Sequence, residues 1–148
     1  MLKINSIRKT FHPGEVNEVK ALQGVTLELR TGEFMVVVGA NGSGKSTLLN
    51  AISGAVFPDS GELMIDGNAV THLAEHHRSK WISRVFQNPL SGTASDLTIL
   101  ENFRLASLRT GTKKVSIGIN QIFKEKVQEK IALLGMGLED KILQPMGT

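Results

Sequence analysis

The glycine-rich stretch at residues 39–47, GANGSGKST, constrains this chain more than any other segment. It fits the pattern G-x-x-x-x-G-K-[S/T], a loop whose backbone curls around phosphate oxygens. Residues 34–38 (FMVVV) precede it and predict a buried strand, and residues 46–52 carry apolar side chains at helical spacing up to Gly54. A strand, a glycine turn and a helix in this order aim backbone N–H groups and the positive end of a helix dipole at one point. The stretch therefore predicts an anion site.

The residue types in this loop assign roles to particular side chains. The Lys45 ammonium is expected to reach the β- and γ-phosphates of a nucleotide, and the Ser46 hydroxyl to bind Mg²⁺. The alternative is an ordinary glycine-rich turn, but four fixed positions match here in the expected strand–helix context. The residues expected to bind the phosphates are Gly39, Ala40, Asn41, Gly42, Ser43, Gly44, Lys45, Ser46 and Thr47.

The composition excludes several other classes of protein. At 148 residues the chain has the size of one domain, and its sequence has no apolar run near the ~20 residues that cross a membrane. It contains no cysteine, which excludes disulfides and thiolate metal sites. The net charge is only +3, and Lys124, Lys126 and Lys130 are interleaved with glutamates, as on a solvated helix face. We therefore expect no nucleic-acid partner.

Alternation of apolar and polar residues predicts strands on both sides of the loop. Residues 2–8, 25–30 and 62–67 show this alternation, and so do residues 81–86. Residues 71–80 favour one or two short helical turns. The pattern therefore predicts an antiparallel layer beside an α/β nucleotide-binding core.

The last third of the sequence predicts two helices. Thr98 and Glu101 fit a capping box at the start of the first helix. Residues 110–118 are polar and predict a loop, after which Asn120 can cap the second helix. The second helix has an apolar stripe formed by Ile119, Ile122, Phe123, Val127, Ile131 and Leu134.

Three further motifs are linked to the loop. The stretch PDSGELMIDG at residues 58–67 resembles the pattern P-x-x-G-x-I-x-[I/L]-D-G, and VFQNP at 85–89 is similar to a Q-loop, V-[F/Y]-Q-x-P. LTILEN at 97–102 resembles the L-T-V-x-E-N that opens a helical subdomain. Together with residues 39–47, these motifs resemble the front part of an ATP-binding cassette (ABC) transporter ATPase subunit. The likeness covers essentially the whole chain, and the combination is far more specific than the loop alone.

The resemblance implies an α/β fold of the P-loop NTPase class and the ABC-ATPase type. Residues 1–33 and 60–72 would form the antiparallel β layer. Residues 34–58 and 73–90 would form the RecA-like nucleotide-binding core, and residues 91–148 the start of the α-helical subdomain.

The resemblance also assigns roles outside the loop. Phe11 matches the aromatic residue that stacks on adenine, where many members have tyrosine; the alternative is a buried anchor under its loop. Gln87 would bind Mg²⁺ or the attacking water, because a neutral amide oxygen can ligate the ion without adding charge. The alternative is an ordinary surface glutamine. Lys45 and Gln87 are therefore the expected catalytic residues.

Other candidate sites are weaker. His72 and His76 lie four residues apart with Glu75 between them, but no further ligand completes a metal site at a plausible spacing. Residues 90–93 (LSGT) echo the family's LSGGQ signature, yet they directly follow the Q-loop and lack its second glycine and glutamine. Asp66 matches the Asp-Gly turn of the antiparallel layer rather than a magnesium aspartate.

The resemblance implies a function and partners. It points to an ATP-binding, energy-coupling subunit most similar to bacterial importer ATPases, whose whole form hydrolyses ATP to drive transport. Implied partners are a second ATPase subunit and membrane permease subunits, the latter contacted through residues 87–102. The implied location is the cytoplasm, on the inner face of the plasma membrane. The alternatives are a soluble ABC ATPase of DNA repair or translation, and a nucleotide-sensing module that does not hydrolyse ATP.

The sequence departs from the family pattern at its end. The signature motif, the aspartate–glutamate pair and the switch histidine have no counterpart up to Thr148. Phosphoryl transfer needs a positioned water and clamped charges besides the phosphate cradle. We therefore expect these 148 residues alone to bind ATP–Mg²⁺ without efficient hydrolysis, and to leave an apolar sheet edge open.

Overall fold

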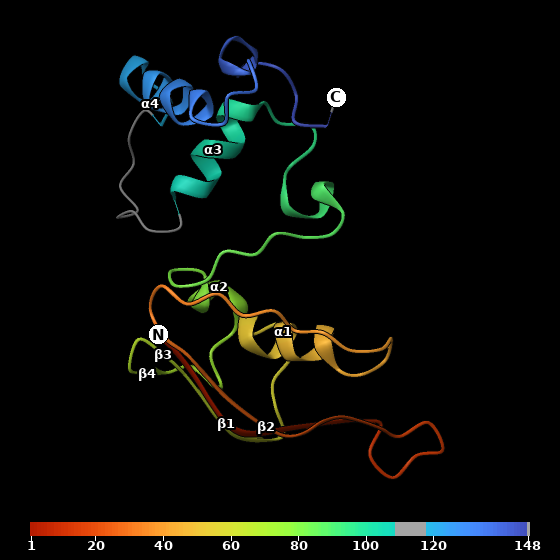
Figure 1. Ribbon diagram of the computed structural model, residues 1–148. Helices are drawn as coiled ribbons and strands as arrows, with labels where there is room; N and C mark the ends of the chain where they lie inside the picture. Colours follow the sequence, from red (N-terminus) through yellow and green to blue (C-terminus); the bar gives the residue numbers. More distant parts are fainter. Residues whose placement is uncertain (109–117, 148) are drawn as a thin grey trace. The chain divides into compact units, whose positions relative to one another are not determined.

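The computed structural model describes residues 1–108 and 118–147 of the chain. These residues form two compact units, Met1–Ser83 and Arg84–Thr148, which we call the first and the second unit (Figure 1). Each unit has its own cluster of buried apolar side chains.

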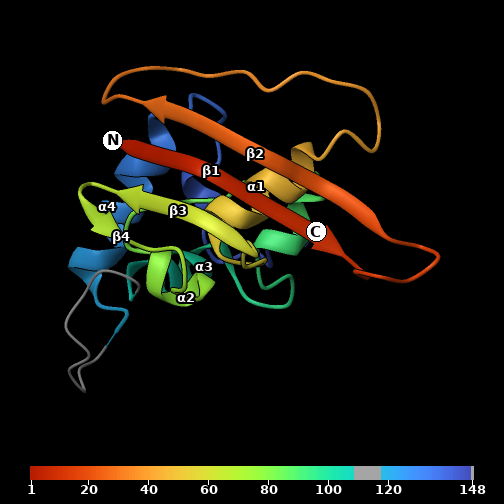
Figure 2. The same cartoon turned by 90° about the horizontal axis from the view of Figure 1, so that it is seen from below.

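A four-stranded antiparallel sheet forms the base of the first unit (Figure 2). Leu2 pairs with Leu29 on one side and with Ile65 on the other, so the first strand is hydrogen-bonded along both edges. The strands expected at residues 2–8, 25–30 and 62–67 are confirmed, with somewhat different ends. The strands lie in the order β2-β1-β3-β4 and are β1 (Leu2–Phe11), β2 (Val19–Leu29), β3 (Ser60–Ile65) and β4 (Asn68–Ala69).

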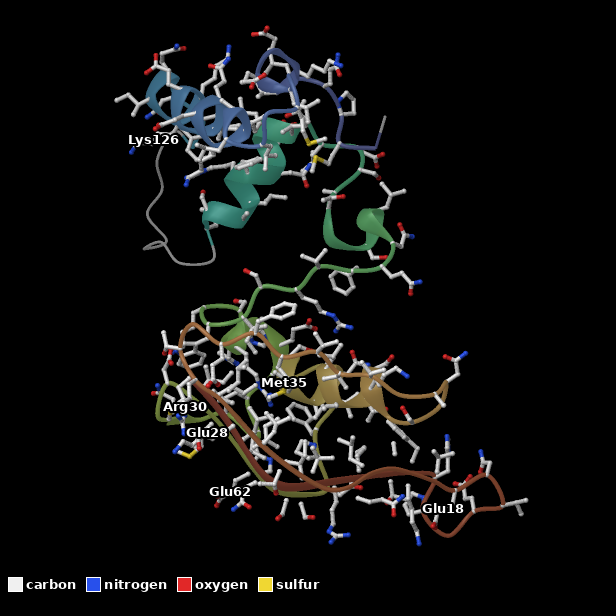
Figure 3. All side chains as sticks on the ribbon, viewed as in Figure 1. Glu18, Glu28, Arg30, Met35, Glu62 and Lys126 are labelled. Carbon is white, nitrogen blue, oxygen red and sulfur yellow. The ribbon has the colours of Figure 1, made fainter. Side chains whose placement is uncertain are left out.

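One helix packs against this sheet. Helix α1 (Lys45–Ser53) places Leu48 and Ala51 in the same buried cluster as side chains of β1, β2 and β3. Within β3, Leu63 is buried and Glu62 points away from α1 on the outer side of the sheet (Figure 3). Burial of one such leucine contributes about 1.5–3 kcal/mol. Packing on the sheet therefore determines which face of α1 is buried and how far the helix lies from the sheet.

The second unit is helical. Helices α3 (Ile99–Ser107) and α4 (Gln121–Ala132) share a core in which Leu100, Val127, Ile131 and Ile142 are buried. The capping box of Thr98 and Glu101 is confirmed, and Asn120 caps α4 as expected. Two short 3-10 helices, η1 (Pro89–Gly92) and η2 (Glu139–Lys141), complete the unit.

The segment after η2 is tied to the start of α3. The Leu100 N–H donates to the Ile142 carbonyl oxygen at 2.9 Å, and the Ile99 N–H donates to Gln144 at 3.0 Å. Because the first N–H groups of a helix have no partner within the helix, these bonds satisfy donors that α3 itself leaves open. The loop expected at residues 110–118 lies, apart from Gly118, outside the described residues.

Two expected strands are absent from the described residues. Residues 34–38 have no regular secondary structure, and of the strand expected at residues 81–86, Trp81 lies in a turn and residues 82–86 have no regular secondary structure either. A strand needs a hydrogen-bonded neighbour, and all sheet pairing among the described residues joins β1, β2, β3 and β4. Phe34 and Val38 are consequently 90% and 86% exposed. The prediction of a buried strand before the loop was therefore wrong for this structure.

Within the described parts of the chain, no helix has both the length and the apolar character needed to span a membrane.

Candidate functional site

The loop at residues 39–47 ends in a turn that only glycine accommodates. Gly42 and Gly44 have φ values of 80° and 88°, in the left-handed region. Gly44 is also the residue directly before α1, and a Cβ at this position would overlap the Ala21 carbonyl oxygen of β2. Strand β2 therefore supports the loop from one side, at a distance that excludes every residue except glycine.

The N-terminal end of α1 is open to an anion. Lys45 is the first residue of the helix, and no side chain of the described residues caps it. Its first turn holds no acidic residue. The first N–H groups of a helix lack partners within the helix and carry the positive end of its dipole. The end of α1 at Lys45 and Ser46 therefore offers donors and a favourable field to a negatively charged group.

The Lys45 side chain folds back over the loop. Its Nζ donates to the carbonyl oxygens of Gly39 at 2.7 Å and Ala40 at 2.6 Å, and lies 3.4 Å from the Ser43 Oγ. The loop is held curled by its own lysine, with the ammonium group over the space that the loop encloses. A phosphate oxygen could replace one of these carbonyls, because a hydrogen bond between two charged groups is the stronger one.

A hollow of about 350 Å³ lies behind the loop. Its walls include Leu22 and Val25 of β2 and Leu48 of α1, together with Val37 and Val38. The same hollow is also lined by Gly39, Ser43, Gly44 and Lys45 of the loop. Apolar side chains therefore line one part of the hollow, and the donors and the cation of the phosphate loop line another part.

Phe11 is the last residue of β1 and lies next to the polar contacts that Asp59 makes with this strand, which we call the clamp at Asp59. Asp59 accepts a hydrogen bond from the Thr10 N–H at 2.6 Å and pairs with the Lys9 Nζ at 2.6 Å, and its own N–H donates to Arg8 at 2.8 Å. The Lys9 hydrogen bond, followed by the Thr10 N–H, lowers the pKa of the Asp59 carboxyl. The Lys9 Nζ lies 5.6 Å from the centre of the half-buried Phe11 ring.

The oxygen atoms of Ser46 and Gln87 fit Mg²⁺ chemically. Both side chains are exposed, and a hydroxyl and an amide oxygen are suitable ligands for an ion that is usually bound through few protein groups and the substrate's phosphates. Ser46 belongs to the first unit and Gln87 to the second. Gln87 precedes Asn88, whose side chain accepts the Leu90 N–H at 3.0 Å and begins η1.

Arg78 is a residue that the sequence did not reveal. It lies in the polar stretch at residues 71–80, for which the sequence predicts one or two short helical turns, yet in α2 (Glu75–Arg78) its side chain is completely buried. Asp59 was also missed as a partner of the segment before Phe11. In the sequence, Arg78 follows two histidines in a polar stretch, and nothing there marks it as buried. Only the contacts of the folded chain could identify it.

Comparisons with known proteins agree on one family. The profile of the family described as "ABC transporter" matches residues 22–146, which is most of the chain. The match includes the loop at residues 39–47 and the start of α1, but not Phe11.

Curated relatives carry transport names. The tyrosine transport ATP-binding protein of Clostridioides difficile is 43% identical over 108 residues, which make up 72% of this chain and 42% of that protein. The ribose import ATP-binding protein RbsA of Ruegeria sp. is 50% identical over 107 residues, covering 72% of this chain and 20% of that protein. The lipoprotein-releasing system ATP-binding protein LolD 1 of Caulobacter vibrioides is 34% identical, with coverages of 96% and 58%. The chain spans less than two thirds of each of these relatives.

Solved structures show the same fold. A dimeric, post-hydrolysis state of the ATP-binding cassette MJ0796 bound to ADP and Pi superposes with a TM-score of 0.77 at 29% identity, covering 98% of this chain and 61% of that one. A nucleotide-free ATP-binding cassette from an ABC transporter gives a TM-score of 0.71 at 27% identity, with coverages of 99% and 58%. The expected fold class, an α/β P-loop NTPase of the ABC-ATPase type, is confirmed. The chain therefore belongs to the ABC transporter family and represents part of its ATP-binding domain.

Proposed function

We propose that this chain binds ATP as the energy-coupling subunit of an ABC transporter, most similar to importer subunits. The observation that carries the proposal is the uncapped start of α1, where the Lys45 ammonium lies over a curled glycine-rich loop. Relatives named for tyrosine transport and ribose import support the transport role. ATP hydrolysis coupled to solute transport is part of the same proposal, since the chain spans less than two thirds of these relatives.

In the proposed complex, residues 39–47 surround the phosphates. The N–H groups at the start of α1 donate to phosphate oxygens, and Lys45 exchanges a loop carbonyl for the β- and γ-phosphates. The adenine stacks on Phe11, on the ring face away from Lys9, whose ammonium already lies beside the ring. In this arrangement, backbone N–H groups bind the charged phosphates of the ligand, and an aromatic ring stacks on its base.

Ser46 of the first unit is a proposed ligand of Mg²⁺, and the family resemblance implies the same role for Gln87 of the second unit. When bound, the ion would neutralise negative charge on the phosphate chain. The Ser46 hydroxyl oxygen and the Gln87 amide oxygen would orient it, and Gln87 would also hold the attacking water. Lys45 and Gln87 are therefore the proposed catalytic residues of this chain.

The proposed partners follow from the family. Membrane permease subunits would contact residues 87–102, and a second ATPase subunit would complete the site, as the dimeric MJ0796 cassette suggests by analogy. The protein would then lie in the cytoplasm, at the inner face of the plasma membrane. Residues 1–33 and 60–72 would form the antiparallel layer, 34–58 and 73–90 the core, and 91–148 the start of the helical subdomain.

Calorimetric titration with MgATP and with inorganic triphosphate tests the proposal. The Lys45→Ala variant should lose at least about tenfold in affinity for both ligands, because both depend on the charge-assisted bonds of the loop. The Phe11→Ala variant should lose affinity for MgATP alone, by about 1–3 kcal/mol of base stacking. A wild-type chain that binds neither ligand, or a Lys45→Ala variant that binds both as the wild type does, would contradict the proposal.

A further inference from the structure

Arg78 is a fully buried cation whose charge the proposed function does not use. Its side chain is 0% exposed, and burial lowers the pKa of its guanidinium. Among the described residues it pairs with no carboxylate, and its four hydrogen bonds all end on backbone carbonyl oxygens. A buried charge without a counter-ion is costly unless its surroundings compensate it. The compensation must therefore come from the carbonyls themselves.

Two of these carbonyls belong to the last turn of α1. Arg78 donates through one nitrogen to the Ala51 oxygen at 2.7 Å and to the Ile52 oxygen at 2.8 Å. The last carbonyls of a helix lack partners within the helix and carry its negative end. Arg78 thus satisfies the C-terminal end of the same helix whose N-terminal end begins at Lys45. The guanidinium is compensated by the negative end of the α1 dipole.

The other two hydrogen bonds join α1 to the segment that leads to α2. Arg78 donates to the Leu73 oxygen at 2.7 Å and to the Thr71 oxygen at 3.0 Å. The contact is closed by Gly54, which ends α1 with a φ of 89°. A Cβ at Gly54 would lie 2.8 Å from the Arg78 Nε and 2.9 Å from the Leu73 oxygen. Gly54 and Arg78 therefore pack tightly against each other at the C-terminal end of α1.

We propose that Arg78 is a positioning residue for the phosphate loop, which it holds in place through α1. This inference rests on the proposed function and deepens it. Packing of Leu48 and Ala51 on the sheet fixes one face of α1, but a helix held along one face can still tilt. Two hydrogen bonds from Arg78 to its far end oppose that tilt, because two more anchor the same guanidinium to the oxygens of Thr71 and Leu73. Arg78 thus controls where the N–H groups at Lys45 and Ser46 point, without touching the ligand.

Simple geometry gives the size of the effect. Helix α1 has nine residues and is therefore about 14 Å long. Pivoting such a helix about its C-terminal end by about 5° moves its start by on the order of 1 Å. In catalysis, a misplacement of about 1 Å can lower a reaction rate on the order of 100-fold, and the hydrogen bonds of the α1 N–H groups to phosphate depend on distance and angle in the same way. A modest loosening at Arg78 is therefore sufficient to weaken phosphate binding.

A purely structural role is the competing explanation. Buried ionic groups can often be replaced by apolar residues without loss of stability, so stability alone does not require a cation at this position. If Arg78 only filled space, its replacement would change the melting temperature and leave the ligand affinity of the folded protein unchanged. The two explanations therefore differ in the affinity measured while the variant is folded.

Chemical rescue distinguishes the positioning role of Arg78 from a purely structural role. In the full chain, Arg78→Ala should bind MgATP at least about tenfold more weakly than wild type at a temperature where circular dichroism shows it folded. Millimolar guanidinium chloride, far below denaturing concentrations, should restore most of the loss, and sodium chloride at the same ionic strength should not. The matched control Lys80→Ala removes an exposed cation two residues further along and should bind as wild type does. Unchanged affinity in folded Arg78→Ala, or rescue of the melting temperature without rescue of affinity, would overturn the proposal.

A second variant decides the question if Arg78→Ala does not fold. Arg78→Lys keeps the charge, but a single ammonium cannot span four carbonyls in the fork geometry of a guanidinium. Without any ligand, it should exchange the amide hydrogens of residues 48–53, which are hydrogen-bonded within α1, faster than wild type does. Unchanged exchange at these residues would overturn the positioning role. Failure of every form of the protein to bind MgATP would instead count only against the proposed function.

Discussion

At the scale of single residues, the close contact between the loop and β2 determines which glycine of the loop is indispensable. Gly44 lies against the Ala21 carbonyl oxygen with a positive φ, whereas Gly42 has a positive φ and nothing near its missing Cβ. Both positions strain an L-residue by about 1–2 kcal/mol, but only Gly44 adds a collision with backbone.

Gly44→Ala should therefore destabilise the protein more than Gly42→Ala. We expect Gly44→Ala to cost more than about 2 kcal/mol, and its matched control Gly42→Ala only about 1 kcal/mol, which corresponds to a fall of roughly 4–8 °C in melting temperature. Differential scanning calorimetry of both variants checks the order. Equal melting temperatures would show that the contact with β2 is not rigid.

The clamp at Asp59 predicts a dependence of stability on pH. The pKa of this carboxyl is lowered in the folded state by the Lys9 hydrogen bond and the Thr10 N–H, so the ionised form stabilises the fold. This contribution is present above the unfolded pKa of about 4 and is lost as the pH falls through the lower folded value. Because Asp59 is largely exposed, its size is only on the order of 0.5 kcal/mol.

Asp59→Asn should remove this dependence. At neutral pH the variant should melt slightly below wild type, because it loses the ion pair with Lys9. As the pH falls below about 4 the two curves should approach each other, and they should meet only below the lowered pKa of the folded Asp59 carboxyl, where the wild-type group is protonated too. Melting temperatures measured from pH 2 to pH 7 test this, and a constant difference across the whole range would contradict it.

The sequence predicts some of these residues and not others. Gly39, Gly44, Lys45 and Ser46 occupy fixed positions of a local pattern, so their roles can be inferred from spacing. Arg78 bonds to carbonyls as far as 27 residues away, and nothing in its neighbours encodes that distance. Contacts of this kind depend on which distant segments the fold brings together, and a single sequence does not show this.

At the scale of elements, the start of α3 shows what local chemistry can specify. Thr98 accepts the Glu101 N–H at 3.2 Å, and the Glu101 carboxylate accepts the Thr98 N–H at 2.8 Å. Both bonds satisfy donors that would otherwise be open, and both could be predicted because the partners are three residues apart. The strand expected at residues 34–38 fails for the opposite reason, since strands depend on neighbours distant in sequence.

Thr98→Ala should destabilise the second unit alone. Loss of the cap costs about 1 kcal/mol, so amide hydrogens in the core of α4, at Val127 and Ile131, should exchange roughly fivefold faster. Thr98→Ser keeps the hydroxyl and serves as the control. Amides of β1 and β3 should not change in either variant. Faster exchange in these strands would mean that the two units do not unfold separately.

At the scale of the whole molecule, the exposed apolar side chains around residues 34–38 stand out. Phe34, Val36 and Val38 are 90%, 67% and 86% exposed, and all three lie within five consecutive apolar residues. Contiguous apolar surface of this kind usually marks a place where protein binds protein. It also raises the risk that the chain associates with itself.

Val36→Lys should reduce self-association. A charge in the middle of this stretch disfavours apolar contact, so sedimentation velocity should show a larger monomer fraction at equal concentration. Val16→Lys is the matched control, because Val16 is fully exposed but isolated among polar residues of the β1–β2 loop. Equal monomer fractions in wild type and Val36→Lys would show that this stretch does not drive association.

The start of α1 and its loop are proposed to bind the phosphates of ATP. Amide chemical shifts measured by nuclear magnetic resonance during a titration with MgATP test this binding at the residues concerned. We expect saturable shifts at Gly42, Gly44, Lys45 and Ser46, with the same dissociation constant for all four and none of these shifts in Lys45→Ala. Saturable binding that leaves these four amides unmoved, or no saturable shift anywhere in the chain, would contradict it.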